Sequence, residues 1–390
     1  MVGKSNVLTG VYVERKDGRL EYRINLGKDI TGKRYYKSVY GKNKTEIRKK
    51  LKEIDINTIQ NMDNVEDVLF KDFALNWMKT YKKPQLKPVS YDRLEQTYNR
   101  VCETFGCVQM GSITTDDLQT FINLLSKNKS YSTVKKHYEF LKNVFGHAIK
   151  TNKLSFDPCL AIELPKERNM SVKTKKAEIL TQEETDAIYQ FNNTLKQSQN
   201  QFFKHVPVLL IMLNTGIRVG EMLALEWSDV DLKKRKMVIN KNLTRAKIRD
   251  EAGNVIGKNK ETFCSSTKTT SSERILPLND TTVELLNQIK AYNKRNKIES
   301  MYVASTLSGG YVSERNLLRT FSSVLGVIGA SHYTIHSLRH TYASRLLKSG
   351  IHVSVVSKLL GHADINTTYK TYIHIVNNQI EEAVELAPRI

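Results

Sequence analysis

Several features that define other classes of protein are missing from this sequence of 390 residues. No run of about 18 apolar residues occurs, and residues 1–30 lack the apolar centre of a signal peptide, so we expect a cytoplasmic protein without a membrane span. The four cysteines form no CxxC pair, which argues against a zinc ribbon or a disulfide framework. We expect them to be ordinary buried or half-buried thiols.

Signatures of the common hydrolases and NTPases are also absent. There is no GxSxG elbow and no GxxxxGK[ST] loop. His336 and His340 have the i, i+4 spacing of zinc ligands on a helix, but Ser337 stands where HExxH has glutamate, and neither Asp nor Glu occurs between Arg315 and Ile351. We therefore expect no metal and no nucleotide cofactor, and His340 is interpreted as a helix-packing residue.

Acidic residues are scarce relative to basic ones. Lys and Arg number 61 against 40 Asp and Glu, and the net charge is +21. An excess of this size favours a polyanionic partner, with nucleic acid ahead of an anionic membrane surface. Residues 1–60 alone carry 15 Lys and Arg against 7 Asp and Glu, which favours a DNA contact there over a merely solvated surface.

Hydrophobic periodicity predicts a multidomain chain that is mainly α with small β-sheets. Strands are predicted at 11–13, 20–26 and 33–40, with a helix at 44–59. A compact helical region follows, then a polar basic linker, then a larger mixed α+β domain. The predicted domains are 1–62, 63–165 and 179–390, separated by a linker at 166–178.

The last domain opens with a capping box at Thr181 and Glu184. An apolar helix at 206–213 ends at Thr215-Gly216, and a second helix is predicted at 219–227. Short strands at 237–239 and 274–278 are predicted around a polar hairpin. Further helices are predicted at 280–296, 313–327, 335–348, 353–360 and 365–384.

Cationic and hydrogen-bonding residues stand at the starts and breaks of these helices. Arg218 follows the break at Gly216, His336 and Arg339 share one helix face, and His362 follows Gly361. Two arginines can bind both non-bridging oxygens of a phosphodiester and stabilise the extra charge of its transition state without a metal. A tyrosine is a suitable nucleophile, because its aryl oxide both attacks and leaves readily. Tyr369 and Tyr372 are both candidates, and helical periodicity does not separate them.

The order of these motifs resembles the tyrosine recombinase family, and within it the phage-type integrases. The resemblance is carried by Thr215-Gly216-Ile217-Arg218-Val219-Gly220-Glu221, Lys268-Thr269, His336-Ser337-Leu338-Arg339-His340-Thr341, Leu360-Gly361-His362 and Thr371-Tyr372. It covers about 178–385 and, more loosely, both upstream domains.

The resemblance implies a role for each matching residue. Arg218 and Arg339 would clamp the scissile phosphate, His362 would donate to a non-bridging oxygen, and His336 would assist proton transfer. Tyr372, ten residues after His362, would be the nucleophile rather than Tyr369. Glu221 would orient Arg218, and Lys268 would protonate the departing 5′ oxygen. Lys260 and Lys258 are alternatives to Lys268, because Thr267 stands where many relatives have a proline.

The implied activity is site-specific DNA recombination through a 3′-phosphotyrosyl intermediate, integrating or excising a prophage, conjugative element or genomic island. The resemblance further implies an arm-type DNA-binding domain at 1–62 and a core-binding domain at 63–165. It implies a homotetramer on double-stranded attachment sites, with no cofactor and no membrane. The protein would be bacterial and nucleoid-associated, with an excisionase and host DNA-bending proteins as partners. Two alternatives remain open: a type IB topoisomerase-like enzyme and a catalytically inactive DNA-binding regulator.

Overall fold

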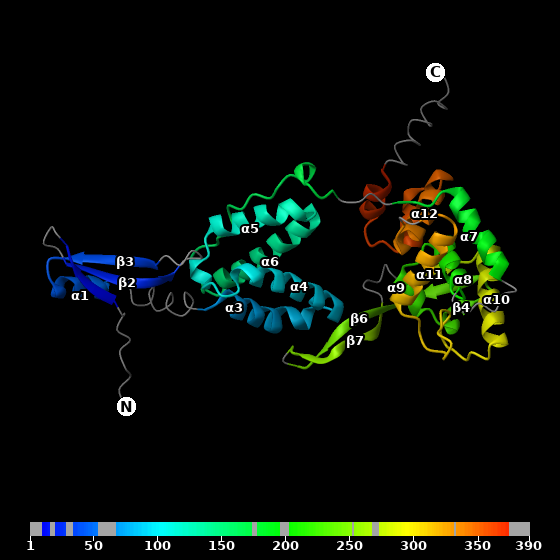
Figure 1. Cartoon of the computed structure of the whole chain (residues 1–390), viewed down its shortest axis with the longest axis horizontal. Coiled ribbons are helices and arrows are strands. Elements are labelled where there is room, and N and C mark those ends of the chain that lie inside the picture. The colour runs from blue at the N-terminus through cyan, green and yellow to red at the C-terminus, as the bar shows by residue number, and fades with distance from the viewer. Residues whose placement is uncertain are drawn as a thin grey trace, which may run out of the picture. The chain divides into compact units, whose positions relative to one another are not determined.

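The computed structural model describes residues 10–15, 20–28, 34–53, 68–173, 178–195, 203–251, 253–266, 273–330 and 333–373. The chain divides into two compact units (Figure 1). The first unit comprises residues 1–175 and 247–259, and the second comprises 176–246 and 260–390. In the part that the structure describes, no helix is long and apolar enough to cross a membrane.

A small antiparallel sheet begins the first unit, with strand order β1–β2–β3. The strands are β1 (Gly10–Glu14), β2 (Leu20–Lys28) and β3 (Arg34–Gly41), and α1 (Lys44–Glu53) follows them. Tyr22, Val39 and Ile47 are buried together, because one face of the sheet is apolar and Ile47 of α1 packs onto it. The predicted sheet and helix are confirmed, while residues 54–59 of the predicted helix lie outside the described residues.

The helical part of the first unit is built from α3 (Phe70–Trp77), α4 (Pro88–Phe105), α5 (Thr115–Asn128) and α6 (Tyr131–Lys150). Between α3 and α4 the chain makes a π-helical turn and a 3-10 turn, Met78–Lys82 and Lys83–Gln85. Local signals start two of the helices: Pro88 stands in the first turn of α4, and Thr114 forms a capping box with Asp117 before α5. Phe70, Phe105 and Phe145 pack in the common core.

The first unit also contains the distal part of a hairpin formed by β6 (Lys241–Arg249) and β7 (Val255–Ser266). Arg249 donates to Asp92 of α4 at 2.5 Å and to Glu95 at 3.0 Å, and Lys247 Nζ donates to Glu95 at 2.6 Å. The side chains of Arg249 and Asp92 are only 6% and 5% exposed. Arg249 also lies over the ring of Tyr91. We call these residues the Arg249 cluster; it attaches the hairpin tip to α4.

The second unit is arranged around α8 (Val206–Thr215). Nine of its ten residues are buried, as expected of a helix that is apolar on every side. The helices that contact it include α7 (Gln182–Leu195), α9 (Val219–Ala224), α10 (Asp280–Arg295), α11 (Glu314–Val327) and α12 (Ile335–Lys348). Figure 1 shows α7, α10, α11 and α12 grouped about it. The helix α13 (Val353–Leu360) and a helical segment at 365–373 follow α12.

An antiparallel sheet of order β4–β5–β8 completes the second unit. Its strands are β4 (Val230–Asp231), β5 (Lys236–Ile239) and β8 (Arg274–Pro277), with Met237 opposite Leu276. The helix predicted at 219–227 is too long, since α9 ends at Ala224. Its continuation is prevented by backbone pairing with a distant segment: Leu225 O accepts from Val303 N, and Trp227 N donates to Met301 O.

The fold class predicted from the sequence is confirmed: the chain is mainly helical, with small antiparallel sheets. The prediction for the cysteines is partly wrong. Cys159 is buried and Cys102 half-buried, but Cys107 and Cys264 are exposed. The domain boundaries given above stay predictions.

Candidate active site

The break between α8 and α9 presents the first arginine. Gly216 ends α8 in a left-handed conformation with φ 63°, and a Cβ there would lie 2.4 Å from the Tyr342 ring. Arg218 then precedes the first turn of α9, and the carboxylate of Glu221 accepts from the backbone N–H of Arg218 at 3.1 Å and from its Nη1 at 2.8 Å. The tight turn and the carboxylate together orient the Arg218 side chain.

Glu221 is held from a second direction by Arg274 of β8. Arg274 Nη2 donates to Glu221 at 2.8 Å, and its Nε donates to Leu359 O at 2.8 Å. The Glu221 side chain is 3% exposed, Arg274 is 7% exposed and Arg218 is 31% exposed. Burial by itself raises the pKa of Glu221, but the bonds and charges of Arg274 and Arg218 outweigh it and lower the pKa. The carboxylate is therefore ionised, and Arg218 is the partly exposed member.

Arg339, on α12, lies beside the glycine turn that follows α13. Gly361 has φ 64°, and its carbonyl accepts from Arg218 Nη2 at 3.1 Å. Arg339 Nη1 donates to Gly216 O at 2.7 Å, and Nη2 donates to Leu360 O at 2.7 Å. The backbone turns after α8 and α13 thus bring Arg218 and Arg339 together.

His362 joins this pair of arginines. Arg339 Nη2 lies 2.8 Å from His362 Nε2, and His362 Nδ1 lies 2.7 Å from Thr368 Oγ1. A guanidinium can only donate, so Nε2 accepts and Nδ1 carries the proton that is donated to Thr368. Burial, with Arg339 and Arg218 nearby, lowers the pKa of His362 to about 4. His362 is thus a neutral imidazole whose tautomer is set by its two partners.

The two histidines of α12 lie one turn apart, with ring centroids 5.6 Å from each other. Burial lowers the pKa of His336, with Arg339 and Arg218 adding to the effect. His340 Nδ1 lies 2.7 Å from the hydroxyl of Tyr372. His340 does pack between α12 and the 365–373 segment, as interpreted from the sequence, but its ring also contacts the polar end of a candidate nucleophile.

The two tyrosines of the 365–373 segment have different surroundings. Tyr372 is 2% exposed and packs in a small cluster with Ala343, Leu347 and Val356. Tyr369 is 38% exposed. Burial raises the pKa of the Tyr372 phenol to about 12, although Arg339 acts in the opposite direction. The structure thus separates two residues that helical periodicity had left equivalent.

The lysine of the sequence-predicted site cannot be placed beside these residues. Lys268 lies outside the described residues, and so do the side chains of Lys258 and Lys260. The structure does bring together the other residues of the predicted site, namely Arg218, Glu221, His336, Arg339, His362 and Tyr372.

Three residues of the site were not identified by sequence reasoning: Arg274, His340 and Thr368. Arg274 is part of the Ser-Ser-x-Arg-x-x-Pro pattern at 271–277, and that pattern was the available signal. Thr368 is fully buried and receives the hydrogen bond of His362, but nothing in its sequence context distinguishes it. Within the described ranges, no group of three or more His, Cys, Asp and Glu side chains could hold a metal ion.

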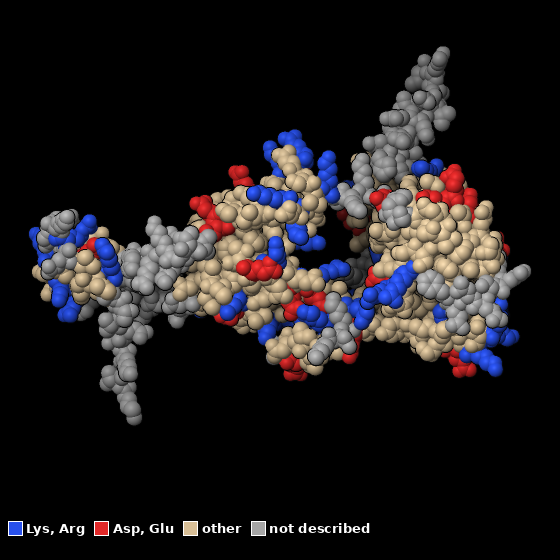
Figure 2. Space-filling model, viewed as in Figure 1, with Lys and Arg blue, Asp and Glu red and all other residues tan. Residues whose placement is uncertain are grey.

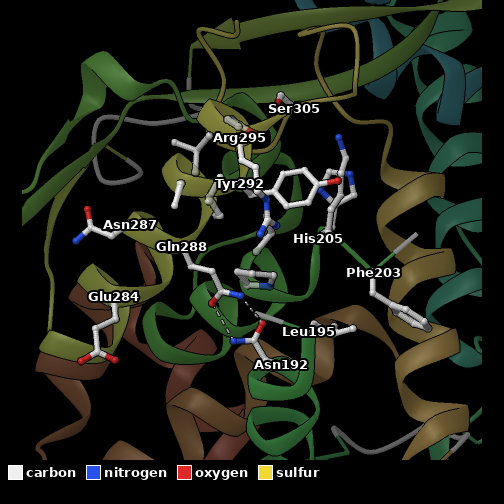
Figure 3. A pocket seen from close by; sticks show the side chains of 17 residues that line it. Asn192, Leu195, Phe203, His205, Glu284, Asn287, Gln288, Tyr292, Arg295 and Ser305 are labelled. Carbon is white, nitrogen blue, oxygen red and sulfur yellow. Dashed lines mark hydrogen bonds between the residues drawn. The ribbon is translucent and has the colours of Figure 1, made fainter. Parts of the chain in front are cut away.

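A cavity of about 480 Å³ lies elsewhere in the second unit, between the start of α8 and α10 (Figure 3). Figure 3 shows Tyr292 and His205 among its lining residues, and Asn192 hydrogen-bonded to Gln288. None of the candidate site residues named in this subsection lines this cavity. The arginines, histidines and Tyr372 therefore form a separate site.

Comparison with known proteins identifies the family of the chain. Residues 178–379 match the model of the phage integrase family, and residues 69–126 match the model of the phage integrase N-terminal SAM-like domain. The chain is 30% identical over 388 residues to the tyrosine recombinase XerC-like protein of Caldanaerobacter subterraneus subsp. tengcongensis, covering 95% of this chain and 96% of that protein. It is 26% identical over 293 residues to the integrase of Staphylococcus phage L54a, covering 71% and 80%.

Solved structures share the fold. The integrase of the Tn1549 transposon, solved with a circular intermediate DNA, superposes with a TM-score of 0.65 at 17% identity, covering 81% of this chain and all of that chain. The lambda integrase tetramer bound to a Holliday junction superposes with a TM-score of 0.57 at 17% identity, covering 92% and 94%.

The fold and the family matches define a tyrosine recombinase, as the resemblance of the motifs implied. The chain belongs to the phage integrase family and is a site-specific recombinase. The comparisons do not favour the topoisomerase-like enzyme or the inactive regulator.

Proposed function

We propose that this recombinase cuts and rejoins double-stranded DNA at attachment sites through a 3′-phosphotyrosyl bond to Tyr372, and thereby integrates or excises a mobile element. The observation that carries the proposal is the convergence of Arg218, Arg339 and His362 at one glycine turn, with Tyr372 packed on the helix that supplies Arg339. Two guanidinium groups at one point, with an imidazole bonded to one of them, suit a phosphodiester that becomes more negative as it is attacked.

Each residue then has a defined task. Arg218 and Arg339 bind the non-bridging oxygens of the scissile phosphate, and Glu221 keeps Arg218 in position. His362 donates to a phosphate oxygen from Nε2 once Arg339 turns toward the phosphate and the imidazole takes the other tautomer, and His336 assists proton transfer. Lys268 protonates the departing 5′ oxygen as a general acid. The bond to Tyr372 conserves the energy of the broken ester, so rejoining needs no cofactor.

The upstream regions supply DNA binding in this proposal. Residues 1–62 bind arm-type sites and residues 63–165 bind the core site, whereas 166–178 link them to the catalytic domain at 179–390. Lys and Arg predominate over β1–β3 and α1 (Figure 2). Exposed members of this group are Arg15, Arg23, Lys42, Lys44 and Arg48. Such a surface matches the phosphate backbone of DNA.

The assembly is proposed to be a homotetramer on two duplexes, acting in the bacterial cytoplasm at the nucleoid, with an excisionase and host DNA-bending proteins setting direction. The solved tetramer of lambda integrase on a Holliday junction, which has the same fold, supports this stoichiometry.

The test is covalent trapping. The full-length protein is incubated with a nicked duplex that carries a junction of the mobile element, so that the cleaved fragment diffuses away and the adduct accumulates. Tyr372→Phe should abolish the adduct, and the matched change Tyr369→Phe should preserve it. The reverse result would refute the assignment. An adduct without strand exchange between duplexes would favour a topoisomerase.

A further inference from the structure

The hydroxyl of Tyr372 is not surrounded by apolar groups alone. His340 Nδ1 lies 2.7 Å from it, and the two rings meet at 62° with centroids 5.9 Å apart. His340 is fixed by α12, and Tyr372 by its packing against Ala343, Leu347 and Val356. Among the described residues, no other side chain bonds to this hydroxyl. The nucleophile therefore already has a proton acceptor within bonding distance.

We propose that His340 takes the phenolic proton of Tyr372 as the tyrosine oxygen attacks the scissile phosphorus. This inference rests on the proposed function and deepens it. The O–H bond of Tyr372 breaks, its proton moves to Nδ1 of His340, and the Tyr372 oxygen forms a bond to phosphorus. The bond from phosphorus to the 5′ oxygen breaks, and that oxygen takes its proton from the separate general acid, Lys268.

The protonation state of His340 in the free protein fits an acceptor. Burial lowers the pKa of His340 to about 4, with His336 and Arg339 adding to the effect. The charged and titratable groups around it are His336 and Arg339 on α12, Tyr372 from the 365–373 segment and His362 after α13. In the part of the chain that the structure describes, no carboxylate contributes, so the imidazole is neutral at pH 7 and Nδ1 can accept.

DNA binding makes the transfer easier. A phosphate held by Arg218 and Arg339 brings negative charge near a histidine that burial had kept neutral, and a nearby negative charge raises the pKa of an imidazole. At the same time the phenol becomes more acidic as its oxygen begins to bond to phosphorus. The two pKa values therefore approach each other only when substrate is bound, which keeps the free nucleophile protonated.

His336 is the other histidine of this helix, and geometry distinguishes the two. His336 has no hydrogen bond to Tyr372 among the described residues, whereas His340 has one of normal length. The two histidines therefore have different roles: His340 accepts the proton of Tyr372, and His336 assists proton transfer at the phosphate. In the rejoining step, His340 returns its proton to Tyr372 as the tyrosine leaves.

The decisive variant is His340→Asn. The asparagine amide lies near the place of Nδ1, so it can still hydrogen-bond Tyr372, but it cannot accept a proton at neutral pH. The matched control is His352→Asn: His352 is exposed at the N-cap of α13, and asparagine is also a favourable N-cap residue. Thermal unfolding and gel-shift binding to the same junction DNA check that both variants fold and bind.

Single-turnover adduct formation is measured from pH 6 to pH 9 on a duplex with a sulfur in place of the bridging 5′ oxygen. A thiolate leaves without a proton, so this substrate removes the need for the general acid and isolates the nucleophile's proton. The wild type should change little with pH, because His340 is already neutral. His340→Asn should be slower on the order of 10²-fold at pH 7 and should gain about tenfold per pH unit as phenolate forms.

The outcomes separate this inference from the proposed function. If the wild type forms no adduct, or Tyr372→Phe still forms one, the proposed function fails. If the wild type reacts through Tyr372 but His340→Asn reacts equally fast, or is slower by the same factor at every pH, then His340 only packs or positions the tyrosine and the inference is overturned.

Discussion

Two buried charge clusters, one in each unit, use the same residue types in opposite proportions. In the second unit, one carboxylate, Glu221, lies between two guanidinium groups, Arg218 and Arg274. In the first unit, one guanidinium, Arg249, lies between two carboxylates, Asp92 and Glu95, and Lys247 balances the charge. The Arg249 cluster has no net charge, whereas the cluster around Glu221 has a net positive charge that Arg339 increases.

The difference shows that similar ion pairs can either attach structural elements to each other or prepare a site for an anion. A buried cluster without net charge attaches one element to another and does not attract a further ion. A buried cluster with excess positive charge is unfavourable until an anion arrives, and a phosphate relieves it. The second unit thus holds its arginines in place with one carboxylate and with the backbone carbonyls of Gly216, Leu360 and Gly361.

The largest effect is expected from Arg339→Lys. Lysine keeps the charge, but its ammonium cannot reproduce the planar set of bonds to Gly216 O, Leu360 O and His362 and still bind phosphate. Adduct formation should fall on the order of 10²–10³-fold, as for loss of a transition-state donor. Single-turnover trapping with saturating DNA measures this. Retention of more than a tenth of the rate would show that charge alone suffices.

A smaller effect, on stability, is expected from Glu221→Gln. It leaves Arg218 and Arg274 without their counterion and should destabilise the second unit by about 3 kcal/mol at pH 7. The pKa of Glu221 is lowered from 4.5, so its contribution is fully present above about pH 5 and is lost as the pH falls through the lowered value.

Hydrogen exchange of the α8 amides at pH 7 and at pH 4 measures this difference, because those buried amides report the opening of the second unit. The gap between wild type and Glu221→Gln should narrow at the lower pH. A gap that stays constant would mean that the carboxylate's charge is not what stabilises the arginines.

The smallest effect is expected in the first unit from Arg249→Met. Methionine keeps the length of the side chain but removes the guanidinium bonds to Asp92 and Glu95. The backbone N–H of Lys247 still donates to Asp92, and Lys247 Nζ still donates to Glu95. A loss of about 2 kcal/mol is expected. Hydrogen exchange should speed up at 247–251 and 253–259 and stay unchanged in α8. Equal acceleration in both units would contradict the assignment of the hairpin tip to the first unit.

Much of the fold was predictable because its signals are local. The start of α5 needs only Thr114 and Asp117, and the end of α8 needs only Gly216. The helix predicted at 219–227 was too long because the pairing of Leu225 with Val303 is not a local property. The segment carrying Lys268 could be interpreted from its sequence order alone, and its role stays a prediction.

The candidate site was predictable to the extent that its residues lie in ordered motifs. Arg218, Arg339, His362 and Tyr372 were assigned from those motifs, and the structure brings them together. Arg274 and His340 were not assigned, because their partners are remote: Arg274 bonds to a residue 53 positions away, and His340 to one 32 positions away.

By itself the sequence determined which segments are helices or strands, their order, the excess of positive charge and the residue types that could bind and attack a phosphodiester. Periodicity, capping and composition are properties of the sequence itself and of neighbouring residues. Only the tertiary structure decided which tyrosine is buried against an acceptor, which arginine orients Glu221 and which helix receives Arg249. These choices depend on close approach between side chains as far as 157 positions apart, and such approach is decided by the packing of whole units.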